Sequence, residues 1–154
     1  MVSELSPATP WRRFMCIAYE SILLFGVLFF FGYGFSALAQ FKGQPGVVRW
    51  IFQGFIFLVL AVYFTWSWSE ARQTLPMKTM SVRLVTDWGK PLGMVRALLR
   101  FICALGLLAL GLAAGTWVHP GLYGLMVIPF AWTLADPQHR AMYDLLCGTR
   151  LIRS

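Results

Sequence analysis

One carboxylate lies inside an otherwise apolar stretch of this sequence. Glu20 is the only charged residue between Phe14 and Leu38, a run of 25 residues. Placing an ionised acid at the centre of a membrane helix costs about 2.5–3.5 kcal/mol, so we expect Glu20 to face other helices, to be paired, or to be protonated. A carboxylate at that depth can carry a proton or a monovalent cation, and it can equally serve as a polar contact that holds helices together.

Arg13 precedes Glu20 by seven residues. Seven residues turn an α-helix by about 700°, so both side chains lie on one helix face, about 10.5 Å apart along the axis. That separation is too long for direct contact unless Arg13 reaches inward. The first apolar helix is therefore predicted to have a basic end with an acid deeper on the same face.

The C-terminal segment carries a second group of charges. Asp136-Pro137 is expected to begin a short interfacial helix, because aspartate is a favoured N-cap and proline a favoured first helical residue. Arg140 and Asp144 would then form an i, i+4 interfacial pair, which contributes a few tenths of a kcal/mol when exposed. Gly148 is predicted to end this helix in the left-handed conformation.

The remaining reactive side chains do not converge on a catalytic or metal-binding pattern. His119 and His139 are predicted to lie at opposite membrane faces, and no nucleophile or carboxylate pair accompanies either one. The three cysteines are far apart in sequence and form no CxxC motif: Cys16, Cys103 and Cys147. We therefore expect no enzyme activity, no cofactor, no metal site and no disulfide framework.

The elements that carry these residues follow from composition. Of the 154 residues, 58% are hydrophobic and 12% are charged, and the mean hydropathy is +0.67. A typical soluble domain is about 45–50% apolar and about 25% charged. A soluble domain of this size would have to expose much of its apolar surface. Composition therefore argues against a soluble enzyme or a disordered regulator and predicts one domain dissolved in a lipid bilayer.

Four apolar runs are expected to form membrane spans, at about residues 14–38, 50–68, 97–118 and 121–135. The first three approach or exceed the roughly 20 residues that a spanning helix needs. The fourth has 15 residues. It is a thin span, a re-entrant segment, or the second half of a helical hairpin that turns at His119-Pro120-Gly121.

The distribution of lysine and arginine predicts the orientation. With four spans, eleven basic residues share a side with both termini and the segment 69–96, and two lie on the other side. The positive-inside rule then places both termini in the cytoplasm, and it disfavours a three-span arrangement that would export the basic tail 136–154. The basic surplus is explained by the membrane surface, so nucleic acid is not expected as a partner. The predicted fold class is an all-α membrane protein, a four-helix transmembrane bundle with a small cytoplasmic β or amphipathic cap.

The cap is predicted from two β-favouring segments that resemble each other. Arg83-Leu84-Val85 lies within the segment 69–96, and Arg150-Leu151-Ile152 lies in the tail. We expect the two to pair in a sheet of two or three strands. The alternative is a pair of unpaired amphipathic segments at the lipid surface.

Small residues on the third span indicate close helix contact. Gly111 and Gly115 form a GxxxG pattern, and Gly106 precedes them. This pattern favours packing against another helix of the same chain or against a second copy, in a homodimer or a larger membrane complex.

Three motifs, in order, resemble the RDD family of multi-pass bacterial membrane proteins. The opening is Trp11-Arg12-Arg13 with an acid seven residues later, and the middle runs from Gln73 to Leu92. The closing motif comprises Asp136, Arg140, Tyr143-Asp144 and Gly148-Thr149. The resemblance covers a single domain over residues 11–153.

The resemblance implies roles for three charged residues. The family is named for an arginine and two aspartates; Arg13 matches the arginine, Glu20 stands at the first aspartate, and Asp144 resembles the closing one. It further implies a bacterial inner-membrane location, and relatives include proposed sodium/proton antiporters and accessory domains of larger assemblies. We expect a non-catalytic accessory or partner-binding protein. The alternative is a small antiporter in which Glu20 carries the proton or the monovalent cation.

Overall fold

The computed structural model describes residues 7–153 and is mostly helical. Three helices are long and apolar enough to cross a membrane: α1 (Pro10–Leu38), α2 (Val47–Trp68) and α4 (Met94–Trp117). The shorter elements are α3 (Leu75–Thr79), β1 (Val82–Thr86), η1 (Pro120–Met126), α5 (Ile128–Ala135), α6 (Met142–Cys147) and β2 (Thr149–Arg153). The prediction of a helical membrane protein with a small sheet is confirmed. The last residue of the predicted tail, Ser154, lies outside the described residues.

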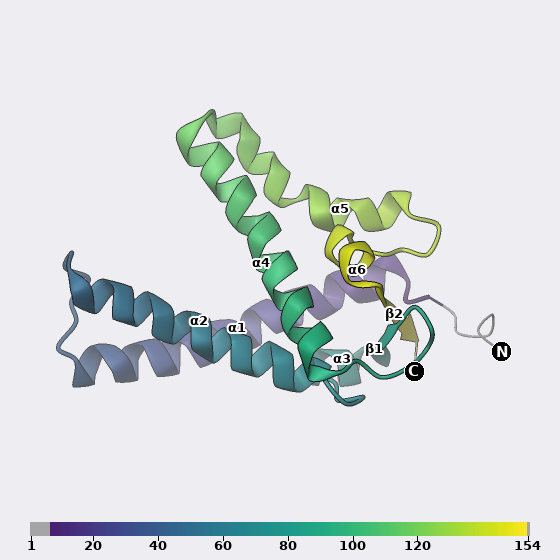
Figure 1. Ribbon diagram of the computed structural model, residues 1–154, viewed down its shortest axis with the longest axis horizontal. Helices are drawn as coiled ribbons and strands as arrows, with labels where there is room; N and C mark the ends of the chain where they lie inside the picture. Colours follow the sequence, from purple (N-terminus) through teal and green to yellow (C-terminus); the bar gives the residue numbers. More distant parts are fainter. Residues whose placement is uncertain (1–6, 154) are drawn as a thin grey trace.

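The long helices form two hairpins that diverge from a shared cap (Figure 1). In the first hairpin α2 returns beside α1, and the Phe35 ring lies 5.3 Å from the rings of both Phe52 and Phe55. In the second hairpin η1 returns beside α4, and α5 continues from η1 toward α6. The two hairpins meet where α2 packs against α4, and they separate toward their tips.

The fourth apolar run consists of two helices of different type. It begins as the 3₁₀ helix η1 and continues as α5, with Pro129 in the first turn of α5, where its missing N–H breaks no hydrogen bond. A 3₁₀ helix rises about 2.0 Å per residue, so the summed axial lengths of η1 and α5 are about 26 Å, whereas 15 residues of α-helix would be about 22 Å long. The predicted hairpin turn is present, and His119 Nδ1 accepts the backbone N–H of Gly121 at 3.0 Å.

The small-residue face of α4 is used within the second hairpin. A Cβ atom at Gly111 would lie 2.7 Å from the side chain of Met126, and one at Gly115 would overlap the ring of Tyr123. A Cβ atom at Gly106 would have no neighbouring atom within 4 Å. Of the two kinds of contact that the sequence left open, Gly111 and Gly115 therefore make the one within the chain.

The cap is built on a two-stranded antiparallel sheet. Leu84 pairs with Leu151 at the centre of β1 and β2. The N-terminal segment extends this sheet, because the N–H of Ala8 donates to the carbonyl of Leu151 at 3.0 Å. The predicted pairing of the two β-favouring segments is confirmed, and the alternative of unpaired segments is wrong.

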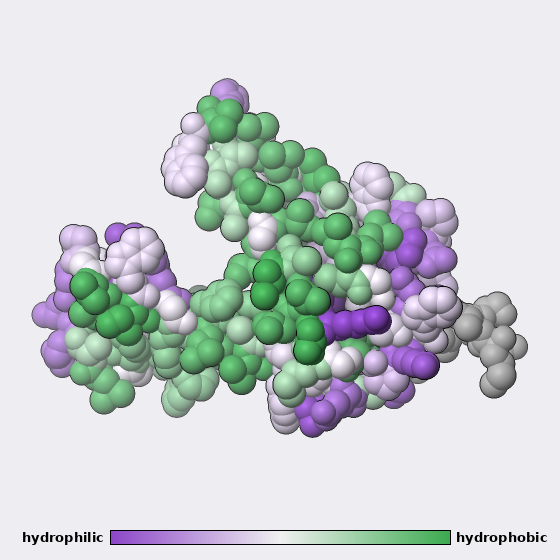
Figure 2. Space-filling model, in the orientation of Figure 1, coloured by the Kyte–Doolittle hydropathy of each residue, from purple (hydrophilic) through white to green (hydrophobic). Residues whose placement is uncertain are grey.

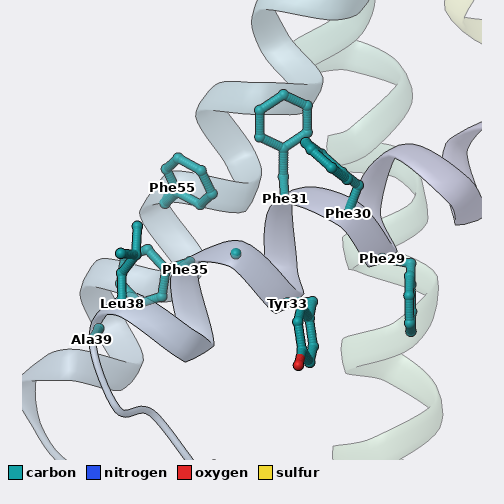
Figure 3. Close-up of a pocket in the computed structure, with 9 residues that line it drawn as sticks. Phe29, Phe30, Phe31, Tyr33, Phe35, Leu38, Ala39 and Phe55 are labelled. Carbon is teal, nitrogen blue, oxygen red and sulfur yellow. The ribbon is translucent and has the colours of Figure 1, made fainter.

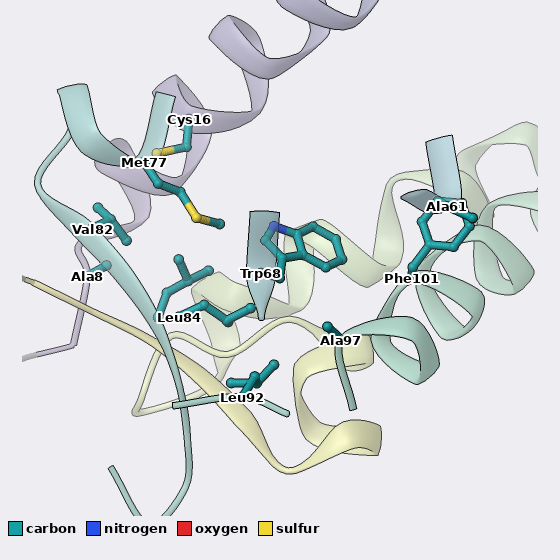
Figure 4. Close-up of a cluster of buried hydrophobic side chains, with 11 residues drawn as sticks. Ala8, Cys16, Ala61, Trp68, Met77, Val82, Leu84, Leu92, Ala97 and Phe101 are labelled. Atoms are coloured by element: carbon teal, nitrogen blue, oxygen red, sulfur yellow. The ribbon is translucent and has the colours of Figure 1, made fainter. Parts of the chain in front are cut away.

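The hydrophobic core lies at the cap, where both hairpins begin. Trp68 lies between Leu84 on the sheet side and Phe101 on α4 (Figure 4). The centre of the Phe64 ring is 4.6 Å from that of the Trp68 ring. This core joins α1, α2, α3, α4 and both strands. The buried members are Ala8, Cys16, Ala61, Trp68, Met77, Val82, Leu84, Leu92, Ala97, Phe101 and Leu151.

The hairpin arms are apolar on their outer surfaces. Within the most hydrophobic stretch of each long helix, 6% of the residues are buried in α1, 6% in α2 and 22% in α4. Hydrophobic side chains cover the arms, and hydrophilic ones gather at the cap and at the tips (Figure 2). Water would not tolerate this much contiguous apolar surface, whereas a bilayer solvates it.

Candidate functional site

A fully buried aspartate occupies the junction between the cap and the helices. Asp144 has 0% relative exposure and lies between two arginines. Its Oδ2 atom accepts a hydrogen bond from Arg13 Nη1 at 2.8 Å. Its Oδ1 atom accepts from Arg100 Nε at 2.9 Å and lies 2.8 Å from Arg100 Nη2. Both arginines are also buried, at 5% and 3% exposure.

Four elements bring these three side chains together. Arg13 lies in the first turn of α1, and Arg100 lies in the second turn of α4. Asp144 is in the first turn of α6, where it accepts the backbone N–H of Ala141 at 3.2 Å and where the helix dipole favours a negative charge. Thr149 at the start of β2 lies 3.4 Å from Asp144 Oδ1. The Arg13–Asp144–Arg100 cluster thus ties both hairpins to the C-terminal segment.

The electrostatics of this cluster keep Asp144 ionised. Burial alone would raise the pKa of the Asp144 carboxyl, but the charges and hydrogen bonds of Arg100 and Arg13 outweigh burial and hold that pKa below its usual range. Two guanidinium groups face one carboxylate, so the cluster carries one uncompensated positive charge. Consistent with that excess, Nε and Nη2 of Arg13 are buried without a hydrogen-bond partner among residues 7–153.

Two aromatic rings enclose the guanidinium of Arg100. Its Cζ atom lies 4.1 Å from the centre of the Trp68 ring and 4.9 Å from that of Tyr143. Cation–π contacts of this kind are worth about 2 kcal/mol when desolvated. The Tyr143 ring also makes an edge contact with the Phe130 ring of α5, and the two ring centres are 5.7 Å apart. This contact connects α5 to the cluster.

A second, smaller polar site surrounds Glu20. Its Oε1 atom accepts a hydrogen bond from the Tyr63 hydroxyl at 2.6 Å, and its Oε2 atom accepts one from Thr74 Oγ1 at 2.8 Å. Tyr63 belongs to α2, and Thr74 is the N-cap of α3, where it also accepts the N–H of Met77. Glu20 therefore joins α1 to α2 and α3, and it remains partly exposed.

Comparison with known proteins gives a family match. The RDD family profile matches residues 7–148, nearly the whole chain. The chain belongs to the RDD family. No curated protein and no solved structure gave a significant match. Arg13 and Asp144, which the resemblance to the RDD family singles out, are bonded directly to each other.

Glu20, the third residue that the resemblance singles out, does not join that cluster. Glu20 and Arg13 share a face of α1, as predicted, but Arg13 turns toward Asp144 and Glu20 toward Tyr63. Arg13, Glu20 and Asp144 therefore belong to two separate sites. One is a sealed ion-pair cluster, and the other is a carboxylate with two hydroxyl donors.

The predicted interfacial pair between Arg140 and Asp144 is wrong. Residues 137–141 are not helical, and α6 begins at Met142. Arg140 and Asp144 therefore do not lie on successive turns of one helix. Arg140 instead donates through Nε to Asp136 Oδ2 at 3.1 Å. This contact lowers the pKa of Asp136. The left-handed conformation of Gly148 at the end of α6 is confirmed, with φ 59° and ψ 48°.

The sequence interpretation missed Arg100. Arg100 was counted only toward orientation, although it lies inside the predicted third span, where a charge needs a partner just as Glu20 does. Trp68, whose ring centre lies 4.1 Å from the Arg100 guanidinium, is also buried, at 7% exposure. The position of Arg100 within an apolar run was the signal that could have identified it.

Proposed function

We propose that this RDD protein is a non-catalytic accessory or assembly protein of the membrane, whose cap holds two transmembrane hairpins in a fixed arrangement for a partner. The observation that carries the proposal is the burial of Asp144 between Arg13 and Arg100. A carboxylate with no exposed surface and a lowered pKa does not exchange protons near neutral pH. The charges of this cluster therefore have a structural role.

We further propose a four-segment topology in a bacterial inner membrane with both termini in the cytoplasm. The charge asymmetry of eleven basic residues against two supports this orientation. The summed axial length of η1 and α5, about 26 Å, supports the fourth run as a crossing segment, because it approaches the roughly 30 Å thickness of the hydrocarbon core. A reporter fused after residue 153 should be active only in its cytoplasmic form.

The shape of the arms supports a partner within the membrane. The hairpins diverge, so their facing surfaces do not cover each other. The outer part of the first hairpin carries a groove lined by aromatic and aliphatic side chains of α1 together with Phe55 of α2 (Figure 3). Association in lipid depends on shape and close packing, and a grooved aromatic surface offers both to another helix.

The proposal is tested by site-specific photo-crosslinking in native membranes. A photoreactive side chain at Tyr33, which lines the groove and is 70% exposed, is expected to give a discrete protein adduct. The same label at Trp88, exposed in the cap, is the matched control for non-specific capture. Adducts with lipid alone at Tyr33, from protein that also purifies without any companion, would contradict the proposal.

A second candidate function is cation/proton exchange at Glu20. The observation that favours it is the oxygen-rich environment of that carboxylate, with hydroxyls of Tyr63 and Thr74 at 2.6 and 2.8 Å. Carboxylate and hydroxyl oxygens suit a small hard cation that competes with a proton. Exchange by so few spans would require a dimer.

Purified protein in proteoliposomes separates the two functions. If the accessory function is correct, an imposed sodium gradient drives no more proton movement than in empty vesicles. If exchange is observed, Glu20→Gln should abolish it, while Glu70→Gln, at an exposed acid of the cap, should leave it unchanged. Exchange that disappears in Glu20→Gln alone would replace the accessory function with the antiporter.

A further inference from the structure

Arg13 uses only part of its hydrogen-bonding capacity in the cluster. Its Nη1 atom donates to Asp144, whereas its Nε and Nη2 atoms are buried and meet no acceptor among residues 7–153. Nε and Nη2 form the edge of a guanidinium whose two parallel N–H groups can bind two oxygens of a carboxylate or a phosphate. Arg100 turns this same edge to Asp144, with contacts of 2.9 and 2.8 Å. Arg13, at 5% exposure, therefore holds a forked donor edge inside the protein that the described residues leave unused.

Asp144 cannot supply the acceptor for this edge. Its Oδ2 atom already accepts from Arg13 Nη1 and from the backbone N–H of Ala141. Its Oδ1 atom accepts from Arg100 and lies 3.4 Å from the Thr149 hydroxyl. A carboxylate has about four lone-pair positions, and these contacts occupy them. The free edge of Arg13 therefore needs an acceptor other than Asp144.

The first turn of α1 adds positive potential at the same place. α1 begins at Pro10, its first turn holds two arginines and no acid, and its N-cap Thr9 makes no side-chain capping bond to a described residue. The helix leaves the N–H groups of Trp11 and Arg12 without an intrahelical acceptor. The N-terminus of a helix attracts anions, so two arginines there increase an attraction that the helix already has. Because a helical side chain leans toward the N-terminus, the free edge of Arg13 lies toward this turn.

We propose that the free edge of Arg13 and the N-terminal turn of α1 form an oxyanion site that binds a phosphate group. Two phosphate oxygens accept from Nε and Nη2, and a third faces the N–H groups of Trp11 and Arg12. Water would satisfy these donors but would not offset the charge, because Arg13 and Arg100 share one carboxylate and Arg12 adds a further cation. A phosphate offsets this excess, and its tetrahedral oxygens suit a fork beside a helix N-terminus better than chloride does.

The phosphate group can belong to a soluble ion or to a lipid headgroup. Trp11 is 66% exposed, and its ring centre lies 6.0 Å from that of Phe14. Exposed tryptophan is typical of the level at which a membrane helix enters the headgroup layer. Arg13 and Cys16 lie on the opposite, buried side of α1. The site is thus at headgroup level but faces the cap, and both sources share the chemistry that the fork recognises.

The test measures binding of radiolabelled inorganic phosphate to the full-length protein by equilibrium dialysis in dodecyl maltoside micelles, which contain no phosphate. We expect saturable binding that sulfate displaces and that chloride at equal ionic strength does not. Arg13→Lys keeps the charge but lacks the fork, so its affinity should fall about 10- to 100-fold. Arg49→Gln, which removes an exposed charge at the tip of the first hairpin, is the control and should bind normally.

Adding phosphatidic acid or diacylglycerol to the micelles separates the two sources. If a lipid phosphate fills the site, phosphatidic acid displaces the radiolabel, whereas diacylglycerol, which has the same chains and no phosphate, does not. If only soluble phosphate fits, neither lipid displaces it. Either result supports a phosphate site and identifies its ligand.

Three results would overturn the proposal. One is the absence of saturable phosphate binding by the wild type, which would leave water as the partner of Arg13. The others are displacement by chloride at equal ionic strength and an unchanged affinity in Arg13→Lys. The first two are read on the wild-type chain, so they do not depend on a variant that must fold. None of them bears on the membrane partner proposed above, which the crosslinks at Tyr33 test separately.

Discussion

Replacing Asp144 by Asn should destabilise the protein more than any other single change in the cluster. The substitution keeps the size of the side chain and much of its hydrogen bonding, but it removes the negative charge between Arg13 and Arg100. Two buried guanidiniums would then face each other without a counter-charge. Removing one partner of a buried ion pair typically costs about 3–5 kcal/mol, a large part of the 5–15 kcal/mol that stabilises most domains.

The charge excess of the cluster gives this prediction a sharper form. Arg13→Gln leaves Arg100 and Asp144 as a neutral pair, so it loses charged hydrogen bonds but strands no charge. Its expected cost is about 1.5–3 kcal/mol, less than that of Asp144→Asn. Because the cluster carries a net positive charge, Asp144→Asn is expected to be less stable than Arg13→Gln.

Unfolding in mixed micelles with increasing SDS, followed by tryptophan fluorescence and circular dichroism, measures both costs. Trp68 is a local probe because its ring lies 4.1 Å from the Arg100 guanidinium. Glu70→Gln is the control, since Glu70 pairs with Arg72 at 63% exposure and should change stability by less than about 1 kcal/mol. An Arg13→Gln variant less stable than Asp144→Asn would refute the charge assignment.

Three further predictions concern pH and packing. The pKa of Asp144 is lower in the folded protein than in the unfolded chain, where it is about 3.9. Its contribution to stability is therefore fully present above about pH 3.9 and is lost as pH falls through the folded pKa. The unfolding midpoint should be constant from pH 7 to about 5 and should decline below about pH 4. Trp68→Leu should cost about 1–3 kcal/mol by the SDS assay, since it removes the ring over Arg100. Gly115→Leu should lower the thermal midpoint in nanodiscs because the side chain meets Tyr123, while Gly106→Leu, with open space, should not.

The membrane fold could be predicted from the sequence because it depends on strong local sequence patterns. Long apolar runs define the helices, and the β-favouring segments in residues 69–96 and in the tail predicted the pairing of β1 with β2. The turn at His119 and the left-handed Gly148 followed from residue chemistry. Each of these features depends on a few neighbouring residues.

The site was only partly predictable, because its contacts join distant parts of the chain. Arg13 and Asp144 were identified by family resemblance, but their contact spans 131 residues and no local pattern specifies it. The i, i+4 rule suggested Arg140 for Asp144, and it failed because residues 137–141 do not form a helix. The irregular path to α6 leaves Asp144 at a helix N-terminus facing two arginines.

We propose that the Arg13–Asp144–Arg100 cluster holds the two hairpins in place and that Glu20 carries no transport chemistry. Spin labels introduced through unnatural amino acids at Lys42 and His119, one near each hairpin tip, would report the separation of the tips in liposomes by pulsed electron paramagnetic resonance. We predict one narrow distance distribution in the wild type, a broad one in Asp144→Asn, and no change in Glu20→Gln. A distribution that stays narrow in Asp144→Asn, or that shifts with Glu20→Gln and with sodium, would contradict the claim.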